Sequence, residues 1–185
     1  LTLFLISCGS DSSGPSAPAL PTAIGGTVVK DRVLASSVTV HGIDTDGSLG
    51  TTLAGPFTTD AAGNWSGELP AGNSGPFYIK ATGGSYVDEA SGANVDISAG
   101  SMLGYSTSGS GIVSPFTQML FDVVAEADAS YTVAEAWLEA IAVFTREFGF
   151  DPTTTVPGTS GDAAASYTAA LGGLSLLIEE TPALS

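Results

Sequence analysis

Apolar and polar residues alternate in short runs between residues 24 and 105. Residues 38–41 read Val-Thr-Val-His, and residues 77–82 read Phe-Tyr-Ile-Lys-Ala-Thr. Alternation with a period of two is typical of a β-strand that has one buried face. Turn-forming pairs such as Asp46-Gly47 and Gly83-Gly84 separate the runs, and each allows a strand to reverse. The pattern predicts about seven strands in two sheets packed face to face, an all-β sandwich.

The apolar spacing changes to that of amphipathic helices beyond residue 112. Ser114 can cap a first helix, and Pro115 can open it,. Apolar residues then recur at intervals of three and four, the spacing of one helix face. They are Phe116, Met119, Leu120, Val123, Val124 and Ala127.

Two further helices are expected after the first. Thr132 and Glu135 have the spacing of a capping box, and Gly149 supplies a left-handed stop,. The apolar residues expected to be buried by this second helix are Val133, Trp137, Ile141, Phe144 and Phe148. A third helix is expected over Asp162–Glu180, with Tyr167, Leu171, Leu174 and Ile178 on one face. Because a lone amphipathic helix gains little in water, residues 112–181 predict a small bundle of about three helices. Truncation of this bundle at its end is a further hypothesis.

The charge balance is strongly acidic. Four Lys and Arg residues stand against nineteen Asp and Glu residues, and the formal net charge is −15. Such a chain cannot neutralise a row of phosphates, so nucleic acid is not an expected partner. The chain holds one cysteine, Cys8, which excludes an internal disulfide and a cysteine-based zinc site,.

Cys8 follows a short apolar run that is too short to span a bilayer,. Residues 5–8 read Leu-Ile-Ser-Cys and resemble the bacterial lipobox, in which an aliphatic, a variable and a small residue precede a cysteine. The resemblance implies that residues 1–8 end a lipoprotein signal and that the Cys8 thiol carries acyl chains. It also implies an extracytoplasmic protein, lipid-anchored at the outer membrane or cell surface. The alternative is a buried cysteine in a short core helix, which the Ser, Gly and Pro residues of the segment 9–23 disfavour, because they predict a flexible tether.

A second resemblance lies in the β-rich region. Residues 58–65 read TTDAAGNW, and residues 69–72 read LPAG. These motifs are similar to those of the carboxypeptidase-regulatory-like and related immunoglobulin-like modules of bacterial surface proteins. The resemblance implies an Ig-like or prealbumin-like sandwich over residues 24–105 with Trp65 in its core, and it leaves the function open.

Aspartates in the predicted turns are candidates for binding a metal ion. Asp44 and Asp46 have the alternate spacing of calcium ligands, although an EF-hand loop opening at Asp44 lacks its glycine and its closing acid here,. A looser Ca²⁺ site made by Asp44 and Asp46 with Asp60 or Asp88 at one end of the sandwich is a hypothesis. The alternative is that these residues only form solvated turns, which aspartate favours.

No set of residues predicts catalysis. His41 is the one histidine, and the alternation places it beside Thr39 on the outward face of its strand,. No G-x-S-x-G motif accompanies it,. The adjacent acids Asp88-Glu89 and Glu179-Glu180 diverge from each other on a strand or a helix, so neither pair shares a site. The sequence therefore predicts a protein that is not an enzyme and has no cofactor other than the Ca²⁺ considered above.

These features predict a non-catalytic, lipid-anchored protein of the cell envelope that presents a β-sandwich and a helical module for structural or binding roles. The expected partners are membrane lipid, through acylated Cys8, and an extracellular glycan or protein. Two alternatives are open: a carbohydrate- or protein-binding adhesin component, and an accessory domain of a secreted hydrolase.

Overall fold

A computed structural model describes residues 19–73, 75–88, 91–97, 99–108, 110–128 and 130–180. Within these ranges the chain forms nine strands and three helices. The strands are β1 (Thr22–Val28), β2 (Ser37–Ile43), β3 (Leu49–Thr58), β4 (Asn64–Leu69), β5 (Phe77–Thr82), β6 (Ser85–Val87), β7 (Asn94–Asp96), β8 (Ser101–Ser106) and β9 (Ser110–Val113). The helices are α1 (Pro115–Ala125), α2 (Val133–Phe148) and α3 (Asp162–Glu180). In these same ranges no helix is long and apolar enough to cross a membrane.

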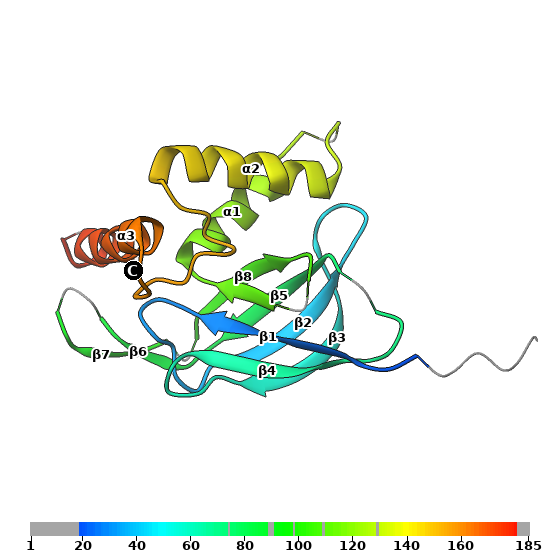
Figure 1. The fold of residues 1–185 in the computed structure, drawn as a ribbon, viewed down its shortest axis with the longest axis horizontal. Helices are drawn as coiled ribbons and strands as arrows, with labels where there is room; N and C mark the ends of the chain where they lie inside the picture. The colour runs from blue at the N-terminus through cyan, green and yellow to red at the C-terminus, as the bar shows by residue number, and fades with distance from the viewer. Residues whose placement is uncertain are drawn as a thin grey trace, which may run out of the picture.

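Seven of the strands form two sheets, and the helices lie on one side of them (Figure 1). The first sheet has the order β4-β1-β9, and the second has the order β3-β2-β5-β8. The pair β1–β9 is parallel, whereas the pairs of the second sheet are antiparallel. The strands β6 and β7 form a separate hairpin. The prediction of a β-rich region followed by three helices is confirmed.

The two sheets bury an apolar cluster between them, which we call the inter-sheet core. Its buried members are Ile24, Val28, Val33, Val38, Val40, Trp65, Leu69, Phe77, Ile79, Ala81, Tyr86 and Val113. Most of these residues come from strands of the two sheets and follow the alternation of β2 and β5, whereas Val33 lies between β1 and β2 and Tyr86 lies in β6. Trp65 is 4% exposed and stacks on Phe57, so its expected place in the interior is confirmed.

The pairing of β1 with β9 requires a residue without a side chain. Gly26 lies opposite Gly111 in the register of this pair. A Cβ atom on Gly26 would overlap the carbonyl oxygen of Gly111. Any larger residue at position 26 would therefore force the two strands apart.

A second apolar cluster, the helix–sheet core, joins the helices to the sheets. Its buried members are Val29, Tyr78, Tyr105, Ile112, Phe116, Leu120, Val124, Ala136, Trp137, Phe144, Phe150, Tyr167 and Leu171. Tyr78 lies on the face of β5 opposite Phe77 and Ile79, yet its side chain is fully buried, because the helices cover that face. β5 is therefore buried on both faces at this point.

The helix ends follow the capping signals of the sequence. Ser114 accepts a hydrogen bond from the Thr117 amide, and a complete capping box closes the start of α1. Thr132 and Glu135 form the capping box of α2, and Gly149 ends this helix at φ 78°. The predicted starts of α1 and α2, the stop at Gly149 and the bounds of α3 are confirmed. The helix α1 ends at Ala125, so Ala127, expected on its apolar stripe, lies beyond it.

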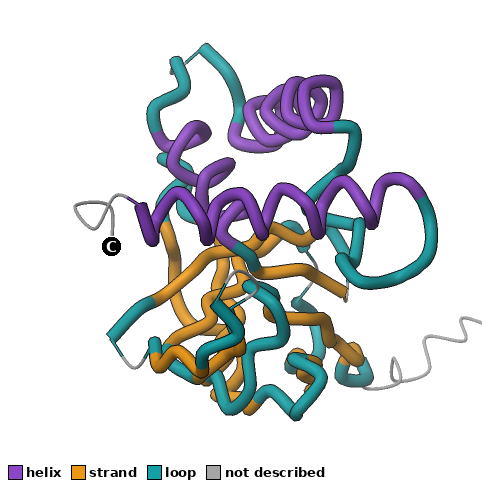
Figure 2. The backbone as a smooth tube through the Cα atoms, turned by 90° about the vertical axis from the view of Figure 1, so that its left-hand side faces the viewer, coloured by secondary structure: helices purple, strands orange, loops and turns teal. Residues whose placement is uncertain are grey.

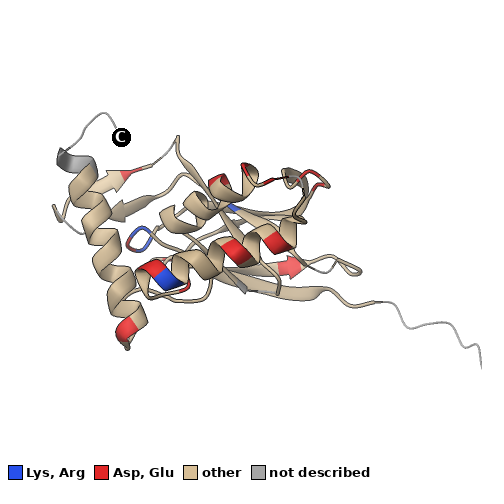
Figure 3. Cartoon of the chain, turned by 90° about the horizontal axis from the view of Figure 1, so that it is seen from above, with Lys and Arg blue, Asp and Glu red and all other residues tan. Residues whose placement is uncertain are grey.

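The three helices do not form a bundle with a core of its own. α3 runs across the end of the α1–α2 pair, near the C-terminus of α2 (Figures 1, 2 and 3). Its Tyr167 ring stacks on Phe150 at 4.4 Å, and its hydroxyl donates to Ser114 Oγ at 2.6 Å. Residues 112 and 113, expected in the helical part, belong to β9. The expected bundle is corrected to a helical layer that shares its core with the sheets.

Candidate functional site: an apolar groove between α1 and α2

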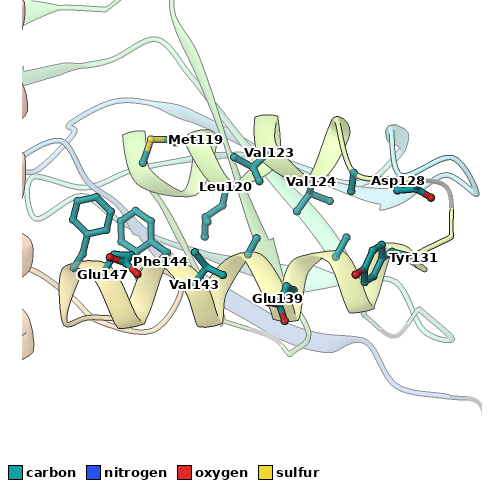
Figure 4. Close-up of a pocket in the computed structure, with 14 residues that line it drawn as sticks. Met119, Leu120, Val123, Val124, Asp128, Tyr131, Glu139, Val143, Phe144 and Glu147 are labelled. Carbon is teal, nitrogen blue, oxygen red and sulfur yellow. The ribbon is translucent and has the colours of Figure 1, made fainter.

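An open groove runs between α1 and α2 on the side away from the sheets (Figure 4). Its volume is about 420 Å³. The lining side chains are Met119, Leu120, Val123, Val124, Ala127, Asp128, Tyr131, Ala136, Glu139, Ala140, Val143, Phe144, Glu147 and Phe148. Most of them are apolar, and the acidic ones stand at its border.

The groove exists because the apolar stripe of α1 is wider than the surface that the rest of the chain covers. Phe116, Leu120 and Val124, spaced four apart, are buried. Met119 and Val123 lie on the flank of this stripe and remain 42% and 57% exposed. A stripe with neighbours three and four apart spans more than 100° of the helix surface, and only part of it faces the sheet.

The facing side of α2 contributes small residues to the floor and larger ones to the end of the groove. Ala136 and Ala140 lie one turn apart in the lining, and their short side chains leave space between the helices,. Val143 is 38% exposed, and Phe148 is 47% exposed.

The aromatic residues of this region divide between the core and the groove. Trp137 and Phe144 are 0% and 5% exposed, so the expectation that they are buried is confirmed, and Phe150, just after α2, is buried as well. The same expectation for Phe148 is wrong. Phe148 stacks on Phe144 at 4.3 Å, but it remains 47% exposed and lines the end of the groove.

Carboxylates stand at the border of the groove and beside it, and local hydrogen bonds lower the pKa of two of them, Asp128 in the lining and Glu135 next to it. Asp128 accepts hydrogen bonds from Ser130, and these bonds lower the pKa of its carboxyl. The hydroxyl of Thr132 lowers the pKa of Glu135 in the same way,. Arg146 pairs with Glu147 at 2.9 Å, and both side chains are largely exposed. The groove thus combines an apolar floor with a negatively charged border (Figure 3).

The three aspartates of the predicted calcium site are not brought together. Asp46 accepts from the amide and hydroxyl of Ser48 in the β2–β3 turn, where Asp44 also lies. Asp60 accepts from two amides of the β3–β4 turn. The ten residues of β3 separate these turns, a distance on the order of 30 Å for an extended strand. In the part of the chain that the structure describes, no three His, Cys, Asp or Glu side chains gather as metal ligands do.

The solvated-turn interpretation accounts for these aspartates. Each carboxylate closes its own turn by accepting local backbone hydrogen bonds, as aspartate commonly does. Asp88 does the same for the amide of Ser91 in another turn. The residues present do not fit one Ca²⁺ ion, so we derive no role through it.

His41 lies beside Thr39, as expected, but the expectation of a surface position is wrong. Its ring is 9% exposed. Nδ1 donates to the carbonyl oxygen of Gly50 at 3.1 Å, and Nε2 lies 2.8 Å from Thr39 Oγ1. The register of β2 against β3 shifts on both sides of His41, and this irregularity allows β3 to cover the ring. The Gly50 carbonyl and the Thr39 hydroxyl therefore hold the ring of His41 between β2 and β3.

Cys8, the predicted lipidation site, lies outside the described residues. The segments 1–8 and most of 9–23, the predicted signal and tether, lie outside them as well. Lipidation therefore remains a prediction from the sequence.

Sequence reasoning missed the groove itself. The spacing of the α1 stripe predicts one apolar helix face, and its width exceeds what a single contact surface covers. The alanines at positions 136 and 140 were the other available signal, because small residues facing a second helix leave room. Comparison of the chain with protein-family models, curated protein sequences and solved structures gave no match.

Proposed function

We propose that this protein is a non-catalytic binding module of the cell envelope, held at a membrane by acyl chains on Cys8, and that it binds an apolar ligand in the α1–α2 groove. The observation that carries the proposal is the groove. Five large apolar side chains that line it, Met119, Val123, Tyr131, Val143 and Phe148, are between 38% and 57% exposed. Contiguous exposed apolar surface of this kind marks interaction sites in monomeric proteins.

The free energy available in the groove is sufficient for a specific contact. Complete burial of one large apolar side chain contributes about 1.5–3 kcal/mol, so burying the half-exposed fraction of five contributes several kcal/mol. Part of this is lost to the ordering of the two partners. The remainder supports a reversible ligand.

The resemblance to carboxypeptidase-regulatory-like modules forms the structural part of the proposal. Two sheets packed on a shared apolar core support it. In the immunoglobulin constant fold the first strand lies beside the second, whereas here β1 lies between β4 and β9. We therefore propose the prealbumin-like member of the two related sandwiches.

Membrane attachment is tested with Cys8→Ser in cells that express the chain behind a complete lipoprotein leader. The variant should move from the membrane fraction to the aqueous phase of a detergent partition, because it has lost its acyl chains. Ser12→Ala, which leaves the cysteine intact, should stay with the membranes. If Cys8→Ser stays in the membrane fraction, the proposal that acyl chains on Cys8 anchor the protein is wrong.

Ligand binding in the groove is tested with Nile red, a neutral apolar dye, on the full chain carrying Cys8→Ser. Val123→Asp should lower its binding by about fivefold or more, because it places a charge in the groove. Val87→Asp is the matched control, since Val87 is 49% exposed on β6 outside the groove, and it should bind the dye unchanged. Equal dye binding by both variants would contradict a groove ligand.

A further inference from the structure

We propose that the occupant of the α1–α2 groove is an amphipathic helix of a partner protein that carries Lys or Arg beside its apolar stripe. This inference rests on the proposed function, in which the groove is the binding site, and it adds the chemistry of the ligand. The evidence is the shape of the groove together with the sign of the charges around it.

The groove has the form of an unfilled position for a third helix. Its lining reaches from Tyr131, before the start of α2, to Phe148, the last residue of that helix. The 16 residues of α2 correspond to a length of about 24 Å. A partner helix of about four turns would match this length, with apolar residues at intervals of three and four entering between the two helices. α3 does not fill the position, because it crosses the end of the pair.

The negative charges at the border of the groove favour a positively charged partner helix. Glu139, Val143 and Glu147 follow one another four residues apart, so α2 presents acid, apolar and acid groups along one face of the groove,. Asp128 adds a third carboxylate at the end nearer the α1–α2 connection. Basic residues that flank an apolar stripe would pair with Glu139 and Asp128, since Glu147 already pairs with Arg146, and would accelerate association.

The surrounding surface strengthens this preference. Residues 114–149 hold six acidic residues and one basic residue, Arg146. Arg146 is already paired with Glu147. The acidic residues are Asp122, Glu126, Asp128, Glu135, Glu139 and Glu147.

A second copy of this chain does not supply such a helix. α1 and α3 contain no Lys or Arg, and α2 contains Arg146 alone. Lys30, Arg32 and Lys80 lie among the strands and their turns. Two copies in contact through this groove would bring like charges together, which is destabilising. Anionic lipid headgroups are disfavoured for the same reason.

The experiment compares two synthetic 16-residue helices that have the same Leu and Ala stripe. One carries Lys on its polar face, and the other carries Glu. Fluorescence anisotropy of each labelled peptide is titrated with the full chain carrying Cys8→Ser. The Lys peptide should bind at least about tenfold more tightly than the Glu peptide.

Two pairs of variants separate groove binding from general attraction to an acidic protein. Glu139→Lys should lower the affinity for the Lys peptide about five- to tenfold. Glu68→Lys makes the same charge change at an exposed position on β4 and should change this affinity less than about twofold. Val123→Asp should weaken the same peptide although it adds a negative charge, and Val87→Asp should not. Equal effects of Glu139→Lys and Glu68→Lys would overturn the inference.

The remaining outcomes distinguish failure of this inference from failure of the proposed function. Nile red bound in a Val123-dependent way, without preference for the Lys peptide, would leave the groove as a binding site and refute the cationic helix. Val123-dependent binding to neutral phosphatidylcholine vesicles would assign the groove to acyl chains instead. Val123-dependent dimerisation in sedimentation would assign it to a second copy. If Val123→Asp binds both Nile red and the Lys peptide as tightly as the parent chain does, both proposals are refuted.

Discussion

The inter-sheet core and the helix–sheet core are built from different kinds of residue. The inter-sheet core is mostly aliphatic, with several Val residues that come from β1, β2 and β9. The helix–sheet core is mostly aromatic, and stacked pairs such as Tyr105 with Trp137, at 4.6 Å, run through it. β-branched residues pack well on a pleated strand surface, whereas a sheet and a helix layer leave larger and less regular spaces that rings can fill.

The two cores also differ in how their polar atoms are paired. Trp137 Nε1 donates to the Tyr78 hydroxyl at 3.1 Å, and that hydroxyl donates to the carbonyl oxygen of Gly47 at 2.9 Å. Among the residues that the structure describes, the buried Nε1 of Trp65 in the inter-sheet core has no hydrogen-bond partner. Directional hydrogen bonds of the helix–sheet core therefore link α2 to β5 and to the β2–β3 turn, whereas the Trp65 ring of the inter-sheet core is positioned by packing.

The largest expected effect is the removal of the ring at the centre of the helix–sheet core. Trp137→Ala should lower the free energy of unfolding by about 3–5 kcal/mol, through lost burial and the cavity left behind. Urea unfolding followed by circular dichroism measures it. Leu138→Ala, at a neighbouring position that is 68% exposed, should cost under about 0.5 kcal/mol. A small effect of Trp137→Ala would mean that the helices contribute little to the stability of the sheets.

A matched deletion in the inter-sheet core should cost less. Val40→Ala removes two methyl groups from a fully buried site and should lower the free energy of unfolding by about 2 kcal/mol. The same urea experiment measures it, with Thr39→Ala on the opposite face of β2 as the comparison. A loss larger than that of Trp137→Ala would reverse the ranking of the two cores.

The paired polar atoms of the helix–sheet core can be tested separately from its packing. Tyr78→Phe keeps the ring but leaves the buried Trp137 N–H and the Gly47 carbonyl without their partner. We expect a loss of about 1–2 kcal/mol. The double variant with Trp137→Phe should lose less than the sum of the two single changes. Full additivity would show that the hydroxyl does not link β5 to α2.

Alkaline pH should act on the helix–sheet core through its tyrosines. Burial raises the pKa of Tyr167 well above its ordinary range, and burial also raises the pKa of Tyr78,. A raised folded-state pKa contributes stability that is fully present below the unfolded pKa of about 10 and is lost as pH rises above it. Because of Tyr167, the free energy of unfolding should fall by about 1 kcal/mol between pH 10 and pH 11. Tyr167→Phe should flatten this dependence in urea titrations, and an unchanged slope would rule out Tyr167 as its source.

Much of the secondary structure could be predicted because its signals are local. The capping box of Thr132 with Glu135, the stop at Gly149 and the start at Pro115 each depend on residues within one turn,. The candidate site could be predicted only in part. The spacing of apolar residues predicts the stripe that contains Met119 and Val123. It does not predict which members of the stripe stay exposed, because that depends on how much of α1 the sheet covers.

The alternation of the strands, the ends of the helices and the acidity of the surface follow from neighbouring residues or from composition, so they can be predicted from the chain. The packing of distant segments is needed to bury both faces of β5 at Tyr78, to cover His41 with β3, and to place Asp44 and Asp60 at opposite ends of one strand. It also decided that α3 crosses the end of α1 and α2 and leaves the groove between them open. These outcomes depend on which surfaces meet, and residues far apart in the chain determine that together.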